Sequence, residues 1–247
     1  MLERLKRRGA PQRPAPTAPP GRRIYAIGDL HGRRDLLDKM HELLRIDAAH
    51  ASGVEKVVIY IGDYIDRGDD SRGVIELLIR KPLDGFRAVH LMGNHEAFLL
   101  RFLEDASIAP NWLANGGDAT LLSYGVPIRF TEFDAIQAQF RRELPQSHLA
   151  FLRRLALSHI EGDYMFAHAG IRPGRDVTQQ DAQDLMWIRD EFLGSNADHG
   201  KVVVHGHSIS PEPQFLDNRI GIDTGAFATG KLTCLVLEGT SRRILQT

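Results

Sequence analysis

Cysteine is almost absent from this sequence of 247 residues, which contains only Cys234. A single cysteine excludes an intrachain disulfide, so we expect a reducing compartment. No apolar run approaches the roughly 18 residues that a membrane-spanning helix needs. No apolar stretch follows the basic N-terminus either, as a secretion signal would require. These absences predict a cytoplasmic protein without a transmembrane segment.

An excess of charge of one sign is also missing. The sequence has 31 basic and 32 acidic side chains, so we expect no nucleic-acid partner. Basic residues nevertheless gather at the start, because residues 1–23 hold seven of them and a single glutamate. Five prolines fall between Pro11 and Pro20. Because proline lacks a backbone donor and like charges resist collapse, we predict a disordered basic tail over residues 1–22. The alternative is a tether for an acidic partner or a membrane surface.

The rest of the sequence has the patterns of one α/β domain, which we predict over residues 23–247. Short apolar runs at 24–29, 54–63 and 86–94 alternate with helical patterns, which indicates βαβ units with parallel strands. Residues 97–157 are mostly helical in pattern and predict a cap inserted into the sheet-forming part. Strand patterns return in four segments: 164–170, 201–207, 219–226 and 231–238.

Most of these strands end in a polar residue beside glycine. Five such motifs occur in the order GDLHG (28–32), GDYIDRG (62–68), GNHE (93–96), HAG (168–170) and HGHS (205–208). Ligands of α/β sheets bind outside the carboxyl ends of the strands. Asp63 follows Asp29 by 34 residues and Asn94 follows Asp63 by 31, each about one βαβ unit. These three strand ends are therefore expected to lie side by side.

The five motifs supply oxygen and imidazole donors and no thiolate. The candidate ligands are Asp29, His31, Asp63, Asn94, His168 and His207. Such donors suit a catalytic Mn²⁺, Fe²⁺ or Zn²⁺ ion, whereas a structural zinc site is usually built from cysteines. Six ligands are too many for one catalytic ion that keeps a position open. They fit two ions that share a bridging carboxylate.

In this order and at these spacings, the five motifs resemble those of the phosphoprotein-phosphatase branch of the calcineurin-like metallophosphoesterases. The resemblance extends from about Arg23 to Glu238. It implies an α/β fold in which a central β-sandwich of two mixed sheets is flanked by helices, with a mostly helical cap insertion. It also implies two divalent metal ions, with Mn²⁺ as the first choice and Fe²⁺ or Zn²⁺ as alternatives.

The resemblance further implies a mechanism, in which a hydroxide that bridges the two metals attacks a phosphomonoester. It assigns Asp29 and His31 to the first metal, Asp63 to the bridging position, and Asn94, His168 and His207 to the second metal. His95 would be the general acid, with Asp66 orienting it. Arg67 and Asn94 would bind the substrate phosphate, together with Arg189, which matches a looser motif.

Three positions keep two interpretations. His205 lies two residues before His207 and is either a further ligand or a packing residue that supports the site. Arg189 either binds phosphate or pairs with an acidic neighbour on a helix surface. The turn-rich segment at 115–125 either shapes the substrate opening or is a structural turn of the cap.

Two substrate classes fit the resemblance. Serine/threonine protein phosphatases resemble this sequence in GDYIDRG and GNHE, whereas symmetrical diadenosine-tetraphosphate hydrolases resemble it in HAG and in residues 222–235. Asp66, which these hydrolases often lack, favours phosphomonoesters such as phosphoserine and phosphothreonine. A non-catalytic scaffold is disfavoured because such proteins normally lose metal ligands, and all six are present here.

Overall fold

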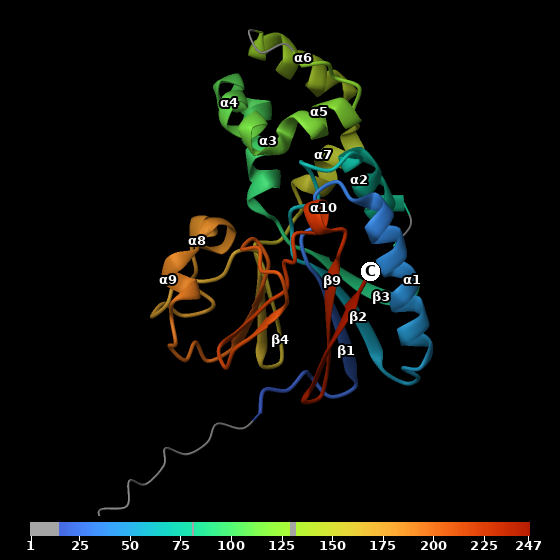
Figure 1. Ribbon diagram of the computed structural model, residues 1–247, viewed down its shortest axis with the longest axis vertical. Helices are drawn as coiled ribbons and strands as arrows, with labels where there is room; N and C mark the ends of the chain where they lie inside the picture. The colour runs from blue at the N-terminus through green and yellow to red at the C-terminus, as the bar shows by residue number, and fades with distance from the viewer. Residues whose placement is uncertain (1–14, 81, 129–131) are drawn as a thin grey trace, which may run out of the picture.

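Two mixed sheets pack face to face in the structure, a computed structural model that describes residues 15–80, 82–128 and 132–247 (Figure 1). The strand order of the first sheet is β10-β9-β1-β2-β3. Its strands are β1 (Arg22–Ile27), β2 (Glu55–Tyr60), β3 (Phe86–His90), β9 (Thr233–Glu238) and β10 (Ser241–Gln246). β2 is parallel to both β1 and β3, whereas β9 is antiparallel to both β1 and β10. The parallel part is the βαβ arrangement that the sequence predicts.

The second sheet has the order β4-β5-β6-β8-β7. Its strands are β4 (Ser158–Glu161), β5 (Tyr164–Ala167), β6 (Val202–His205), β7 (Gln214–Phe215) and β8 (Arg219–Gly221). β6 is parallel to β5 and β8, and β4 and β7 run antiparallel at the edges. The predicted fold class, two mixed sheets flanked by helices, is confirmed.

Apolar side chains from both sheets form a common core. Val57 and Ile59 of the first sheet are fully buried and belong to one cluster with Phe166 and Val204 of the second. Val58, which lies between them, points to the opposite face and packs in the cluster that contains the helices. The strand reads as a continuous apolar run because both of its faces are covered.

Helices cover the outer faces of the sheets. α1 (Arg34–Ala49) and α2 (Ser71–Arg80) pack on the first sheet, and α8 (Ala182–Trp187) and α9 (Asp190–Leu193) pack on the second (Figure 1). A short helix, α10 (Ala226–Thr229), precedes β9. Within the described ranges, no helix is both long enough and apolar enough to span a bilayer.

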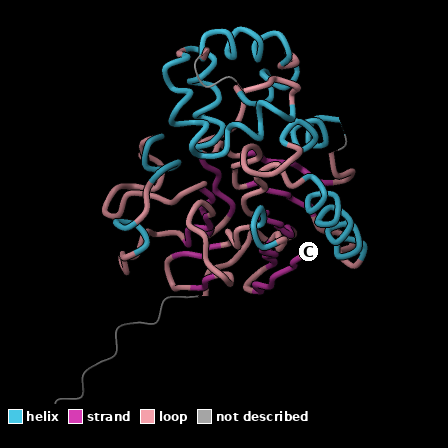
Figure 2. The backbone as a smooth tube through the Cα atoms, turned by 45° about the horizontal axis from the view of Figure 1, so that its top comes forward, coloured by secondary structure: helices cyan, strands magenta, loops and turns pink. Residues whose placement is uncertain are grey.

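The cap is a group of helices at one end of the strands (Figure 2). It contains α3 (Asn94–Glu104), η1 (Ala106–Ile108), α4 (Ala109–Trp112), η2 (Leu113–Gly117), α5 (Asp118–Ser123), α6 (Phe133–Glu143) and α7 (Gln146–Leu152). Its first helix begins at Asn94, three residues before the predicted start of the cap. The residues of the GNHE motif from Asn94 onward therefore form the first turn of α3.

The chain packs on the sheets before the predicted start of the domain. Ala18 is 1% exposed and its N–H donates to the carbonyl of Gly239 over 2.8 Å. The N–H of Thr17 donates to the Asp163 carboxylate over 3.0 Å. Residues 15–22 of the predicted basic tail therefore include backbone groups that bond to the second sheet and the last hairpin, and Arg22 begins β1. Residues 1–14 lie outside the described residues.

Candidate functional site

The predicted polar residues converge at one end of the two sheets. Asp29 and His31 follow β1, Asp63 follows β2, Asn94 begins α3 after β3, His168 follows β5 and His207 follows β6. Each of them is at most 8% exposed. Three strands of the first sheet and two of the second supply them, so the site lies where the open ends of the sheets meet.

Asp63 is at the centre of this group. Its Oδ2 lies 3.5 Å from Nε2 of His31, 3.4 Å from Nε2 of His168 and 3.8 Å from Nε2 of His95. The donors form two overlapping clusters, and within each of them one ligand atom per residue lies within 4.8 Å of the others. One cluster is His31, Asp63 and His95, and the other is Asp63, His168 and His207. A carboxylate shared by two donor clusters has the geometry of a bridging ligand.

Backbone carbonyls fix the orientation of two of these imidazoles. The Nδ1–H of His31 donates to the carbonyl of Ile65 over 3.0 Å, and that of His168 donates to the carbonyl of Ile61 over 3.1 Å. Each ring therefore presents the lone pair of Nε2 to the centre of the site. Metal-binding histidines in proteins are typically oriented in this way.

Two contacts bear on a cation among the donors. Nε2 of His168 lies 2.9 Å from Oδ1 of Asn94, a separation at which both atoms can bind the same ion. Nε2 of His207 is buried and has no hydrogen-bond partner among the described residues. Unpaired buried polar atoms are rare and call for an explanation. The donors therefore fit a divalent metal.

The electrostatics of the carboxylates agree with this interpretation. Burial raises the pKa of Asp63 to about 6, and burial together with Asp223 and Asp63 raises the pKa of Asp29 well above its usual value. Because burial is the main cause of both shifts, an ionised carboxylate is costly at these positions, and divalent cations would offset that cost. Asp223, which follows β8 and is 4% exposed, contacts Asp29 and raises its pKa further.

The backbone around the site is strained. The described non-glycine residues with positive φ are His31, Asp63, Asp66, Arg67 and His207, with φ between 43° and 72°. All five belong to the predicted site, in agreement with the tendency of strain to gather at functional positions. Glycine is required at two positions beside site residues, because a Cβ on Gly93 would lie 2.1 Å from Asp63 Oδ1 and one on Gly206 would lie 2.0 Å from Asp29 Oδ1.

His95 and Asp66 form a buried pair. The Nδ1–H of His95 donates to Oδ2 of Asp66 over 2.6 Å, and both residues are at most 1% exposed. Burial lowers the pKa of His95, but the Asp63 charge and the hydrogen bond with Asp66 outweigh it, so the pKa lies above its usual value. Nε2 of His95 faces Arg67 Nη2 at 3.3 Å, so a group bound to Arg67 would be within reach of His95.

Glu96 supports the loop that carries Asp63. Its carboxylate accepts hydrogen bonds from the backbone N–H groups of Asp63, Tyr64 and Gly93 over 2.8–3.0 Å. It is fully buried and lies in the first turn of α3. These contacts lock the loop after β2 to the start of the helix that carries Asn94 and His95.

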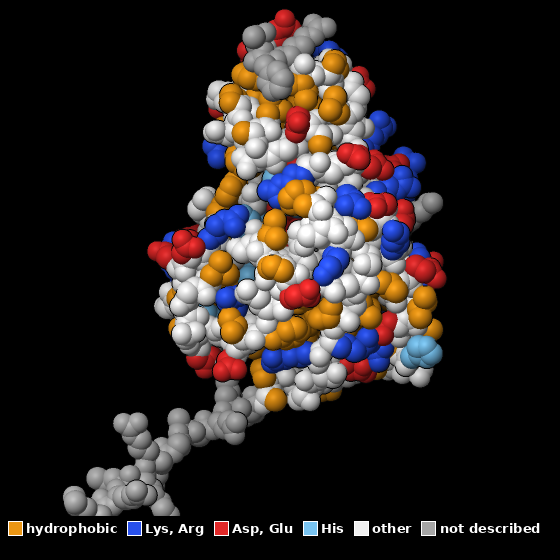
Figure 3. Space-filling view, viewed as in Figure 1, with side chains coloured by type: hydrophobic (Ala, Val, Ile, Leu, Met, Phe, Trp, Pro, Cys, Tyr) orange, Lys and Arg blue, Asp and Glu red, His pale blue; other side chains and the backbone are white. Residues whose placement is uncertain are grey.

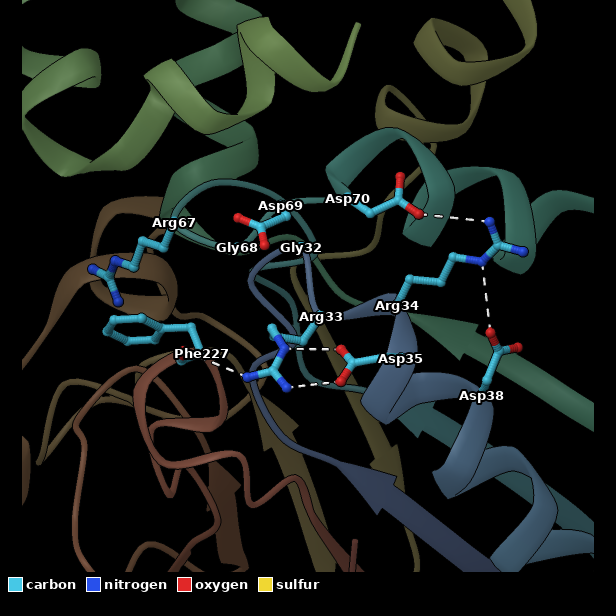
Figure 4. A pocket seen from close by; sticks show the side chains of 10 residues that line it. All are labelled: Gly32, Arg33, Arg34, Asp35, Asp38, Arg67, Gly68, Asp69, Asp70 and Phe227. Carbon is cyan, nitrogen blue, oxygen red and sulfur yellow. Dashed lines mark hydrogen bonds and ion pairs between the residues drawn. The ribbon is translucent and has the colours of Figure 1, made fainter.

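Arg67 lies between the polar cluster and an open cavity of about 580 Å³ (Figure 4). Its Nη1–H donates to Nε2 of His31 over 3.0 Å, and its guanidinium lies 4.7 Å from the centre of the Phe227 ring. Arg33 donates to the carbonyl of Ala226 over 3.0 Å and so anchors α10, which carries Phe227. Other arginines and aspartates line the cavity, and basic and acidic side chains are interspersed over the face drawn in Figure 3.

Arg189 and His205 lie at the edge of the site. Arg189 is exposed, and its Nη1 is 3.4 Å from Ser208 Oγ. Burial and then its positive charge lower the pKa of His207 to about 3, which puts the guanidinium close to the second cluster. The ring of His205 is directed elsewhere, because Nδ1–H donates to the Gly206 carbonyl over 3.0 Å and Nε2 faces Arg219 at 3.4 Å. This geometry favours a packing role for His205.

Sequence reasoning missed four residues around the site. Asp223 had a detectable signal, because IDTG (222–225) repeats the pattern of a polar residue beside glycine after a strand. Phe227 contacts Arg67 and His31 from a helix of only four residues. Trp112 and Thr120, in the cap, donate hydrogen bonds to Asp66. No spacing rule connects these last three to the site.

Comparison with known proteins gives consistent matches. A model of the calcineurin-like phosphoesterases matches residues 22–232. Serine/threonine-protein phosphatase 2 of Salmonella typhimurium is 28% identical over 223 residues, which cover 86% of this chain and 91% of that protein. The asymmetrical bis(5'-nucleosyl)-tetraphosphatase PrpE of Bacillus thuringiensis is 24% identical and covers 85% and 88%.

A solved structure named as a diadenosine tetraphosphatase superposes with a TM-score of 0.60. The sequences are 24% identical, and the match covers 91% of this chain and 93% of that one. At this identity the likeness concerns the fold. The tetraphosphatase relative reported above is named as an asymmetrical hydrolase, whereas the sequence motifs resembled those of the symmetrical enzymes.

Proposed function

The chain belongs to the calcineurin-like phosphoesterase family, and from this premise we propose that it is a phosphomonoesterase that acts on phosphoserine and phosphothreonine residues of proteins. The observation that carries the proposal is the buried His95–Asp66 pair, with its hydrogen bond of 2.6 Å. A serine or threonine alkoxide is a poor leaving group and needs a proton as the P–O bond breaks. The phosphate leaving group of a nucleoside polyphosphate needs one far less.

Two divalent ions fit the donors described above. We assign Asp29 and His31 to the first, Asp63 to both, and Asn94, His168 and His207 to the second. When bound, such ions supply a water acidic enough to attack phosphorus near neutral pH and neutralise charge on the phosphoryl oxygens. Mn²⁺ is our first choice, and Fe²⁺ and Zn²⁺ suit the same oxygen and imidazole donors.

The side chains around the ions divide the remaining work. The fork of Arg67 binds two phosphoryl oxygens, with the buried Asn94 and the exposed Arg189 as further contacts. The nucleophile attacks phosphorus in line with the leaving oxygen, and the electron pair of the breaking P–O bond passes to that oxygen. His95 gives its Nε2 proton to the same oxygen, while Asp66 keeps the Nδ1–H bond. The products are inorganic phosphate and the free hydroxyl of the protein.

Hydrolysis of a dinucleoside tetraphosphate is the second candidate function. The PrpE relative supports it at an identity close to that of the protein phosphatase. The Phe227 ring supports it as well, because it lies beside Arg67 on the wall of the cavity and offers a surface on which a nucleobase could stack. A substrate comparison separates the two functions.

We expect the protein reconstituted with Mn²⁺ to hydrolyse a phosphothreonine peptide with a kcat/KM at least about tenfold above that for diadenosine tetraphosphate, equivalent to about 1.4 kcal/mol of transition-state stabilisation. An aryl phosphate serves as the reference substrate, and reconstitution with Fe²⁺ and Zn²⁺ tests the choice of metal. A preference for the dinucleotide would instead support the second function. Its products then distinguish asymmetrical cleavage, which gives AMP and ATP, from symmetrical cleavage, which gives ADP alone.

A further inference from the structure

The carboxylate of Asp66 is held by two side chains from the cap. Nε1–H of Trp112 donates to Oδ2 over 2.9 Å, and the hydroxyl of Thr120 donates to Oδ1 over 2.6 Å. Oδ2 also accepts the Nδ1–H of His95. Asp66, Trp112 and Thr120 are all fully buried, so water does not compete for these bonds. Both carboxylate oxygens have a fixed partner, which leaves the group a single orientation.

The cap also holds the backbone of the same loop. Asp66 and Arg67 are consecutive non-glycine residues in the left-handed region, with φ of 72° and 68°. Such residues cost about 1–3 kcal/mol each and persist only where surrounding structure supports them. The N–H of Asp66 lies 2.9 Å from the Thr120 hydroxyl, and the N–H of Arg67 donates to the carbonyl of Gly116 over 3.0 Å. Each strained residue is therefore bonded to the cap.

The local structure of the cap is shaped for this contact. The helix is kinked within residues 113–117, where Gly116 has a φ of 97°, a left-handed conformation that favours glycine. A Cβ on Gly116 would lie 2.7 Å from the Arg67 side chain, and one on Gly117 would lie 2.6 Å from the Trp112 ring. Gly116 allows the cap to approach the loop closely, and Gly117 leaves room for the Trp112 ring that bonds to Asp66.

We propose that Trp112 and Thr120 are positioning residues for the general acid, so that the cap completes the active site instead of only covering it. They hold Asp66 in the orientation that accepts Nδ1–H of His95, and this directs the Nε2–H of His95 toward the leaving oxygen. Without them, Asp66 can rotate away and the imidazole is free to turn. The inference rests on the proposed function, because it requires His95 to be the acid.

The variants Thr120→Val and Trp112→Phe test this role, because each removes one hydrogen bond to Asp66 and keeps most of the side-chain volume. We expect turnover of a phosphothreonine peptide to fall about 10- to 100-fold, the same range as for residues that orient metal ligands. Turnover of 4-nitrophenyl phosphate should fall less than about threefold, because its leaving group needs little help from an acid. Metal content should not change, and Thr120→Ser should restore activity.

Thr233→Val is the matched control. Thr233 is 1% exposed and its hydroxyl bonds to Thr224 and Gln246, away from Asp66. It receives the same substitution and should leave the ratio of the two turnover rates unchanged. If Thr120→Val does not fold, as judged by thermal unfolding, Trp112→Phe decides.

Equal losses on both substrates, or no loss on either, would overturn the positioning role while His95 stays the acid. His95→Ala, measured in parallel, separates this failure from that of the proposed function. If His95→Ala slows both substrates equally, the acid assignment itself is wrong, and the positioning role falls with it.

Discussion

Replacing Asp63 with asparagine is expected to abolish binding of the metal pair and turnover together. Oδ2 of Asp63 lies within 3.8 Å of three imidazole nitrogens, and its side chain belongs to both donor clusters. An amide carries no charge and is a poor bridge between two cations, so the substitution should reduce bound divalent metal from two ions to one or none. Metal ions contribute several kcal/mol of transition-state stabilisation. Turnover of an aryl phosphate should therefore fall at least about 10³-fold.

Asp69→Asn provides the control for this experiment. Asp69 lies in the same loop and is exposed, so its replacement removes the same charge without touching the donor clusters. Metal content measured by mass spectrometry and turnover measured on the same samples should both stay near the wild-type values. An Asp63→Asn protein that retained two ions and most of its activity would contradict the assignment of Asp63 as the shared ligand.

His95→Ala is expected to lower turnover of alkyl phosphates by about 10²–10⁴-fold, the usual contribution of general acid catalysis. Activated aryl phosphates should lose much less, because their leaving groups need little protonation. The physical reason is the position of the imidazole, held by Asp66 on Nδ1 while Nε2 faces Arg67. The measurement is kcat on a series of phosphomonoesters with leaving groups of rising basicity.

The same variant tests a competing role for His95. Its Nε2 also falls within the donor cluster of His31 and Asp63, which would allow it to bind a metal. As the acid, His95 can be removed without loss of an ion, whereas as a ligand it cannot. His50→Ala, which replaces an exposed histidine, is the matched control. A His95→Ala protein that lost one ion, or that hydrolysed alkyl phosphates at the wild-type rate, would contradict the acid assignment.

Much of the site could be predicted from the sequence because its residues obey local rules. Each of Asp29, Asp63 and Asn94 follows a parallel strand at about one βαβ interval, so the fold has to bring them together at one edge. Glycine beside each polar residue marks places where a Cβ would clash, as Gly93 and Gly206 demonstrate. The two-sheet fold class followed from the resemblance of these motifs to those of the metallophosphoesterases.

The contacts of the cap with the site could not be predicted in this way. Trp112 and Thr120 approach Asp66 across more than 40 residues of sequence, beside a helix kink at Gly116 that no periodic pattern reveals. The four residues of α10, which carry Phe227, are too few to produce a helical pattern. The sequence motifs do not determine the substrate class either, because the protein phosphatase and tetraphosphatase relatives match this chain to similar extents.

The most direct test of the central claim, that the loops of the two sheets join to hold a pair of cations, is to titrate the metal-free protein with Mn²⁺. Isothermal titration calorimetry gives the number of ions bound, and electron paramagnetic resonance reports whether they interact. We predict two ions per chain and a spin-coupled spectrum, because in this proposal both ions would share the single carboxylate of Asp63. One ion per chain, no binding, or two ions without magnetic coupling would contradict the account.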